Sequence, residues 1–134
     1  MAISDLLPRK AMGSKTRGQT LHDRLDYDQK KEKTEDGELV SSYMCCPETA
    51  AEEFEMSKLI YETSTGRSQP KDRDIIAYRI IQSFKPGEIT PEEANKLGYE
   101  LAMKFTKGKH QFVVSTHVDK AHIHNHVEFN STNL

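Results

Sequence analysis

The histidines near the end of the chain constrain the fold most. Four of the six fall within ten residues, inside the segment HVDKAHIHNHVEFN, residues 117–130. Three of these, His122, His124 and His126, alternate with other residues. Because successive side chains of a β-strand point to opposite faces, an extended chain places the three imidazoles on the same face as Asn130, and the apolar residues of the segment on the other. The pattern therefore predicts a strand with an imidazole-lined face and an apolar face that can be buried.

Alternating imidazoles on one strand face can bind a metal ion. Residues two apart on a strand are separated by about 6.6 Å, so two rings can converge on one ion through metal–nitrogen bonds of about 2.1 Å. His122 and His126 start about 13 Å apart, which is too far for all three rings to share an ion. One adjacent pair is therefore expected to bind, with His117 of a neighbouring strand as the third ligand. Three histidine ligands leave positions open for water or substrate, as in catalytic metal sites.

The segments before the histidines read as alternating strands and helices. Strand-forming residues occupy residues 38–44 and 75–84. Residues 46–66 are predicted to be a helix, because this segment has proline and acidic residues at its start and glycine at its end. A second helix is predicted over residues 90–105, where Thr90 and Glu93 form a capping box. Its expected apolar face consists of Ala94, Leu97, Leu101 and Phe105.

The last two strand-like runs predict an antiparallel hairpin, since only the residues VDKA separate HQFVVSTH from HIHNHVEF. The order strand, helix, strand, helix, strand, strand predicts an α+β fold, with helices packed on one side of an antiparallel sheet. Residues 39–134 are expected to form this core. Residues 1–38 are expected to be a polar N-terminal segment, with no strand in its first 19 residues and at most a short helix from Thr20.

Composition limits the partners and the compartment. The net charge is −2 and 30% of the residues are charged, so attraction to DNA must come from local features rather than from overall charge. The two cysteines, Cys45 and Cys46, are adjacent and cannot readily form a disulfide with each other, which fits a reducing compartment. No apolar run approaches the roughly 20 residues of a membrane span. We therefore expect a cytoplasmic protein.

The histidine segment resembles the signature of relaxases, the mobilisation nucleases of conjugative and mobilisable elements within the HUH endonucleases. That signature is His-x-Asp, a short gap, His-x-His, and Asn four residues later. The matching positions here are His117, Asp119, His124, His126 and Asn130. A similarity to relaxases of mobile elements in Gram-positive bacteria extends over residues 21–134. The chain looks like an N-terminal fragment, because family members continue into further sheet and helices.

The resemblance implies site- and strand-specific DNA nicking at an origin of transfer. In this family a tyrosine forms a 5′-phosphotyrosine link with single-stranded DNA, assisted by a divalent metal, Mg²⁺ or Mn²⁺. The segment LDYDQKKEKT resembles the N-terminal motif of the family and makes Tyr27 the expected nucleophile. The implied metal ligands are His117, His124 and His126. Other relaxosome proteins are the implied partners, in the conjugative mobilisation of a plasmid or transposon.

Three further residues have open roles. His122 either lies behind the ligands or faces DNA, or it replaces His126 in the triad. Asp119 either accepts the free N–H of an imidazole or belongs to a turn. Asn130 either contacts phosphate or a ligand, or is a polar residue at the strand end. The alternative function is a non-catalytic metal- or single-stranded-DNA-binding module, and a zinc-stabilised structural domain is a third possibility.

Overall fold

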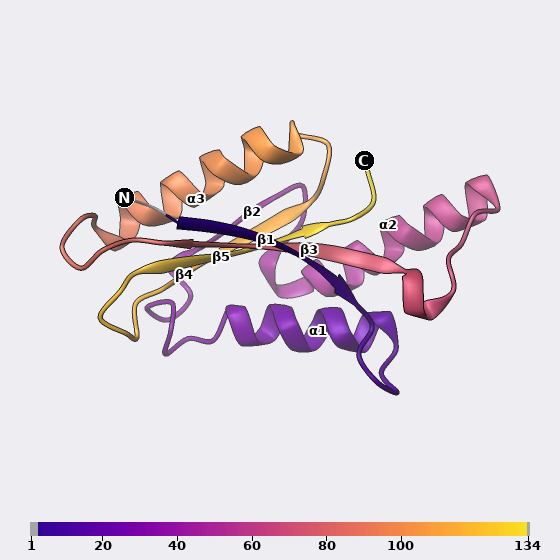
Figure 1. Cartoon of the computed structure of the whole chain (residues 1–134), viewed down its shortest axis with the longest axis horizontal. Helices are drawn as coiled ribbons and strands as arrows, with labels where there is room; N and C mark the ends of the chain where they lie inside the picture. Colours follow the sequence, from indigo (N-terminus) through magenta and orange to yellow (C-terminus); the bar gives the residue numbers. More distant parts are fainter. Residues whose placement is uncertain (1–2, 134) are drawn as a thin grey trace.

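The computed structural model describes residues 3–133, with side chains described from residue 6 onward (Figure 1). In chain order the elements are β1 (Ile3–Lys10), α1 (Arg17–Asp28), β2 (Val40–Tyr43), α2 (Ala50–Thr65), β3 (Ile75–Ser83), α3 (Pro91–Thr106), β4 (Phe112–His117) and β5 (His124–Asn130). The strands form one sheet in the order β1-β3-β5-β4-β2, in which every neighbouring pair is antiparallel. The predicted α+β class with an antiparallel sheet is therefore confirmed.

The predicted hairpin of β4 and β5 is present and lies in the interior of the sheet. His117 pairs with His124 across the hairpin, and β3 pairs with the other edge of β5. β5 begins at His124, so His122 lies in the preceding turn and the strand carries only two of the three alternating imidazoles. Val127 and Phe129, on the opposite face, are buried as expected.

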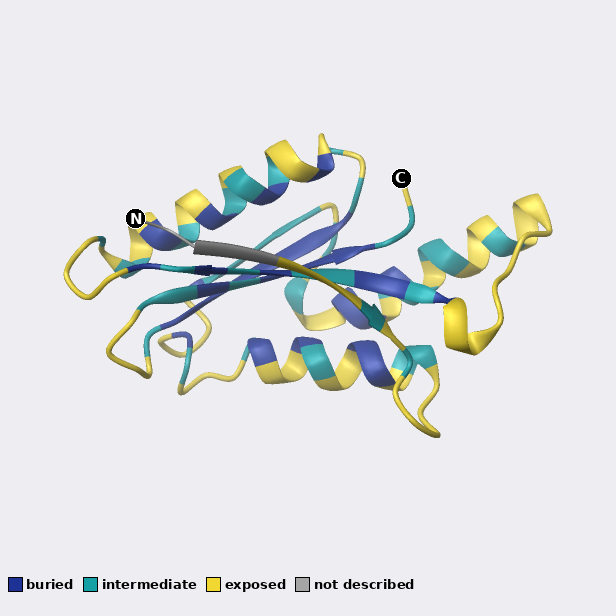
Figure 2. Ribbon diagram, viewed as in Figure 1, coloured by how far each residue is buried: buried dark blue, intermediate teal, exposed yellow. Residues whose placement is uncertain are grey.

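Helices cover both faces of the sheet, which corrects the expectation that they pack on one side. α3 lies on one face, and α1 and α2 lie on the other (Figure 1). Successive residues of β4 show the reason, because Val113 packs with side chains of α1 and α2 whereas Val114 packs with α3. A strand that is apolar at consecutive positions can bury both of its faces. Figure 2 shows buried positions along the sheet-facing sides of α1 and α3.

The two helices predicted from sequence are both present. α3 begins with the predicted capping box of Thr90 and Glu93. α2 follows a short 3₁₀ turn that starts at Pro47, and it ends at Gly66, which adopts a left-handed φ of 69°. None of the helices that the structure describes is long and apolar enough to span a membrane.

Small residues of α3 face the sheet, so the predicted apolar face of this helix is only partly correct: Ala94 is buried and Leu101 packs against the core. Leu97 and Phe105, expected on the buried face, are 41% and 50% exposed. A Cβ placed on Gly98 would lie only 2.6 Å from Nδ2 of Asn125 on β5. Because α3 approaches β5 this closely, small residues form its contact with the sheet. The buried positions of α3 are Ala94, Gly98, Ala102 and Thr106.

The N-terminal segment forms an edge strand and a full helix, which corrects the expectation of no strand there. β1 pairs with β3 and has a neighbour on one side only. Such an edge position tolerates Pro8, whose presence argues against a strand in the sequence alone. α1 is longer than the short helix expected, because it starts at a capping box of Thr16 and Gln19. Its Leu21 and Leu25 are buried in the core on the α1 face of the sheet.

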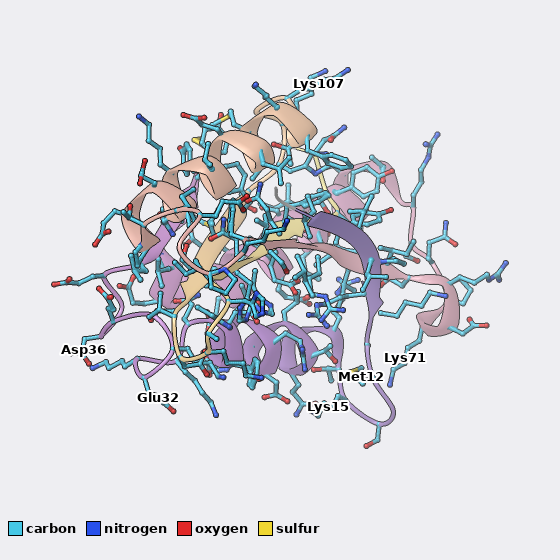
Figure 3. The ribbon with its side chains drawn as sticks, turned by 60° about the vertical axis from the view of Figure 1, so that its left-hand side comes forward. Met12, Lys15, Glu32, Asp36, Lys71 and Lys107 are labelled. Atoms are coloured by element: carbon cyan, nitrogen blue, oxygen red, sulfur yellow. The ribbon has the colours of Figure 1, made fainter. Side chains whose placement is uncertain are left out.

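The loop after α1 is tied to the end of β4. The backbone N–H of Val118 donates to the carbonyl of Lys33 over 2.8 Å, and that of Thr116 donates to the carbonyl of Leu39 over 2.9 Å. Figure 3 shows Glu32 and Asp36 pointing outward from this loop. These bonds hold the C-terminal end of α1 beside His117, the last residue of β4.

Candidate metal centre and nucleophile

Three imidazoles of the β4–β5 hairpin converge under α1. His117 ends β4, and His124 and His126 lie on one face of β5. Each ring offers a nitrogen, and the three nitrogens lie within 4.8 Å of one another. The ring centroids are 4.2 to 5.0 Å apart. In Figure 3, nitrogen-bearing side chains gather between α1 and the sheet. The three rings therefore share a common focus.

Hydrogen bonds determine which ring nitrogens remain free. Nε2 of His117 lies 2.7 Å from the carbonyl oxygen of Asp28, and Nδ1 of His124 lies 3.2 Å from the carbonyl oxygen of His122. Since a carbonyl only accepts, each of these nitrogens carries the proton of a neutral ring. Nδ1 of His117 and Nε2 of His124 then keep free lone pairs. Nδ1 of His126 lies 3.6 Å from Oδ1 of Asp28.

The environment keeps the two more deeply placed rings uncharged. Burial lowers the pKa of His117, and burial together with the neighbouring imidazoles lowers the pKa of His126 to about 3. Both rings are therefore neutral at pH 7. A neutral imidazole is the form that binds a metal ion, so no proton has to be displaced from these two rings.

Tyr27, in the last turn of α1, lies beside the triad. Its ring centroid is 6.5 Å from that of His117, and the two rings meet edge to face. The side chain is 41% exposed, so it is also accessible from solvent. Three cations surround the ring, with Arg24 at 5.5 Å, Lys30 at 5.3 Å and Lys33 at 5.2 Å from its centroid. The chain thus gathers positive charge around Tyr27 although its net charge is −2.

The other four tyrosines lie elsewhere. The hydroxyl of Tyr43 donates to the carbonyl of Gly108, and its ring stacks on Phe112. Tyr78 and Tyr99 also pack against phenylalanine rings, each 5.2 Å away between centroids. Tyr61 is exposed on α2. Among the described residues, Tyr27 is the tyrosine in ring contact with the triad.

Comparison with known proteins identifies the family. Residues 22–134 match the protein family described as "Relaxase: MobA/VirD2-like, nuclease domain". The chain belongs to this family. It is 41% identical over 81 residues to the group II intron-interrupted relaxase LtrB of Lactococcus lactis subsp. cremoris, which covers 55% of this chain and 14% of that protein.

Two further relatives of this relaxase domain come from Staphylococcus aureus, and both are called protein rlx. One is 43% identical over 94 residues, which covers 70% of this chain and 27% of the relative. The other is 39% identical over 100 residues, which covers 75% of this chain and 28% of the relative. The matched region therefore spans between 14% and 28% of the length of these three relatives.

The three further candidate residues with open roles do not join the triad. Asp119 lies in the bend between β4 and β5, as the turn alternative expects, and it forms an ion pair with Nζ of Lys33 over 2.8 Å rather than a hydrogen bond to an imidazole. The side chain of His122 is exposed, and the residue contributes only its carbonyl oxygen, to His124. Asn130 is fully buried, and its side-chain amide donates to the carbonyl of Phe54 and to Oε1 of Gln111. Its bonds tie β5 to α2.

Asp28 is a site residue that the sequence analysis missed. Its carbonyl accepts the hydrogen bond from His117, and its carboxylate faces His126. Burial raises the pKa of the Asp28 carboxyl, while the positive charges of Arg9, Arg24 and Arg79 oppose that rise. The available signal was helical spacing, because positions 21, 25 and 28 fall on one stripe of α1 and all three are buried.

A buried ion pair lies next to Asp28 on the same face of the sheet. Nε of Arg9, on the edge strand β1, donates to Oε1 of Glu128 on β5. Burial raises the pKa of the fully buried Glu128 carboxyl, and the positive charge and hydrogen bond of Arg9 oppose the shift. Arg79 pairs with Glu128 across β3 and β5 in the strand register. β1 therefore supplies one of the charges that surround the candidate centre.

Proposed function

We propose that the chain nicks one strand of DNA at an origin of transfer, through Tyr27. The phenolic oxygen of Tyr27 would form a bond to phosphorus while the bond from phosphorus to the 3′-oxygen breaks. The products are a 5′-phosphotyrosine link and a free 3′-hydroxyl, which receives the proton that tyrosine loses. The observation that carries this proposal is the 6.5 Å separation between the rings of Tyr27 and His117, which brings the nucleophile beside the triad.

The triad fits a divalent metal ion held by His117, His124 and His126. Two of the three rings have depressed pKa values through burial, and hydrogen bonds leave one nitrogen free on His117 and on His124. Metal–nitrogen bonds of about 2.1 Å keep two ligand nitrogens within about 4.2 Å, so small side-chain rotations would bring the present cluster onto one ion. Mg²⁺ or Mn²⁺ at this position would polarise a non-bridging phosphate oxygen and offset charge that develops in the transition state.

The cations around Tyr27 support a single-stranded DNA substrate. Arg24 and Lys30 approach the face of the Tyr27 ring, and a phosphodiester brought to the phenolic oxygen would lie close to both. Lys33 is held by Asp119, which limits its contribution. Backbone phosphates bind to such local positive charge irrespective of the net charge of the protein. In the cell we place this reaction in the cytoplasm, within conjugative mobilisation and together with other relaxosome proteins.

The proposal is tested with a labelled pool of single-stranded oligonucleotides of randomised sequence and Mn²⁺. We expect an SDS-resistant protein–DNA adduct, whose DNA can be recovered and sequenced to read the nick site. Tyr27→Phe should abolish the adduct. Tyr61→Phe should leave it unchanged, because Tyr61 is 43% exposed, similar to Tyr27, but lies on α2. Both variants should retain the far-ultraviolet circular dichroism of the wild type.

Three other results would contradict parts of the proposal. An adduct that survives Tyr27→Phe would move the nucleophile to another residue. DNA that binds with no adduct at any sequence would favour a non-catalytic metal- or single-stranded-DNA-binding module. Tight binding of zinc alone, in a closed site with four ligands, would favour a structural metal domain.

A further inference from the structure

The carboxylate of Asp28 faces the candidate centre and has no hydrogen-bond partner among the described residues. The residue is 1% exposed, and neither carboxylate oxygen is hydrogen-bonded to any described residue. Nδ1 of His126 is likewise buried and without a hydrogen-bond partner among the described residues. The two groups face each other at 3.6 Å. A buried acceptor opposite a buried donor, both unsatisfied, is an arrangement that a small movement would convert into a hydrogen bond.

We propose that Asp28 is a positioning residue, which orients two of the three imidazoles for metal binding. Its carbonyl oxygen holds the Nε2–H of His117, and its carboxylate accepts the Nδ1–H of His126. Nδ1 of His117 and Nε2 of His126 would then be the nitrogens left free to hold an ion. The distance between Asp28 and His126 has to shorten by about 0.7 Å to reach an ordinary hydrogen bond. Carboxylates that accept the second N–H of a metal-bound histidine fix the tautomer of the ring and raise its basicity.

The position of Asp28 also connects the ligands to the nucleophile. Tyr27 and Asp28 are consecutive residues in the last turn of α1. The same short stretch of backbone therefore carries the attacking oxygen and holds two ligand rings. Any displacement of this turn would therefore change the orientation of the two ligand rings and the position of the phenol together. This part of the inference rests on the proposed function, whereas the orientation of the histidines does not.

A purely structural role for Asp28, as a counter-ion for partly buried arginines, makes a different prediction. Arg9, Arg24 and Arg79 lie near enough to affect its carboxyl electrostatically. If charge balance were its only role, its removal would lower stability without changing the imidazole tautomers. Asp74 provides a matched control, because it is a buried carboxylate on the same chain that pairs with Arg17 and Lys58. It is bound to none of the three histidines.

The test measures histidine tautomers by long-range ¹H–¹⁵N spectra of the metal-free protein at pH 7. In the wild type we expect the Nδ1–H form for His126 and the Nε2–H form for His117. Asp28→Leu removes the carboxylate and keeps the carbonyl, so His126 should shift toward the Nε2–H form while His117 stays as it was. Asp28→Asn, whose amide oxygen can still accept, should give a smaller shift. Asp74→Asn should change neither ring.

Metal affinity provides the second measurement. Titration of Mn²⁺ should show a loss of about 10- to 100-fold for Asp28→Leu, a smaller loss for Asp28→Asn, and wild-type affinity for Asp74→Asn. An Nε2–H tautomer of His126 in the wild type would overturn the inference, and this result needs no variant. Unchanged tautomer and affinity in a folded Asp28→Leu, or in Asp28→Asn if the leucine variant does not fold, would also overturn it. Neither measurement uses DNA, so a failure of this inference can be distinguished from a failure of the nicking proposal.

Discussion

The close approach of α3 to β5 predicts that Gly98→Ala destabilises the protein. A Cβ at this position would lie 2.6 Å from Nδ2 and 2.9 Å from Cγ of Asn125, and 2.8 Å from Cγ1 of Val114. Neither neighbour is the free end of a flexible side chain. Nδ2 of Asn125 donates to Gln82 and to the carbonyl of Ala94, and Thr116 donates to its Oδ1. The added methyl must therefore displace both a packed valine and a fully bonded buried amide.

The expected cost follows from these contacts. Overpacking of a tight core costs about 1–3 kcal/mol, and the loss of one hydrogen bond of a buried amide costs about 1–3 kcal/mol. The higher helix propensity of alanine than of glycine offsets about 1 kcal/mol of this destabilisation. The added Cβ approaches both neighbours within 2.9 Å, so both costs apply and we expect a net loss of about 1–5 kcal/mol in the free energy of unfolding. Urea denaturation followed by circular dichroism should show a lower midpoint with an unchanged slope.

The control for this prediction is Gly18→Ala. Gly18 also lies in a helix, α1, but the nearest atom to an added Cβ is Oγ1 of Thr16 at 4.0 Å. Without a clash, only the propensity gain remains, so this variant should be as stable as the wild type or more stable by up to about 1 kcal/mol. If Gly98→Ala behaves like Gly18→Ala, then α3 does not contact β5 as described and the argument from small residues fails.

Three further predictions concern the candidate site. His124→Ala should abolish Mn²⁺ binding in a calorimetric titration, whereas His122→Ala should leave it unchanged, because the cluster uses only the carbonyl of residue 122. Lys30→Gln should weaken single-stranded DNA binding and reduce its salt dependence by a slope of about 0.7, while the same change at the neighbouring exposed Lys31 should have less effect. The pKa of His126 is about 3, against a usual 6.5. Below pH 6.5, His126 is therefore protonated in the unfolded chain but stays neutral in the folded chain. Folding stability should therefore fall more steeply from pH 6.5 to 4.5 in the wild type than in His126→Gln, as denaturation midpoints would reveal.

Local sequence patterns correctly predicted the helices and strands whose stabilising contacts lie between residues close in sequence. The capping box of Thr90 and Glu93 and the left-handed glycine at Gly66 mark helix ends through bonds within a few residues. The β4–β5 hairpin is likewise local, because its two strands are joined by six residues, 118–123. The alternation in β5 also gave the correct burial of Val127 and Phe129. In each case the determining contacts lie within one short stretch of chain.

The features that could not be predicted depend on contacts across the fold. β1 is a strand because β3 offers it an edge, whereas its own residues, with a proline inside, do not favour one. The buried face of α3 is set by how closely the helix approaches Asn125, so Gly98 and Ala102 lie inside and the larger Leu97 lies outside. Hydrophobic periodicity assumes that larger apolar residues are buried. That assumption fails where close packing against a sheet selects small side chains.

The same distinction applies to the candidate site. The triad was predictable because two of its members are neighbours on one strand and the third ends the adjacent strand of a hairpin. Of the two roles considered for Asp119, the orientation of an imidazole is not seen, because Lys33 reaches this carboxylate from the loop after α1. Asp28 precedes His117 by 89 positions, and no local pattern relates the two. Only the packing of α1 on the sheet brings them together.

The rotation of α1 about its own axis reconciles two demands on a nicking site. In the function that we propose, the imidazoles must be sheltered enough to stay neutral, whereas the nucleophile must reach DNA. Leu21 and Leu25 are buried against the sheet, and position 28 continues their stripe, so Asp28 points at the imidazoles. One residue along a helix is a rotation of about 100°, so Tyr27 points to the rim of the site and remains 41% exposed. A charged residue in place of Leu25 should therefore damage metal binding and adduct formation together, since it would turn the helix that carries both groups.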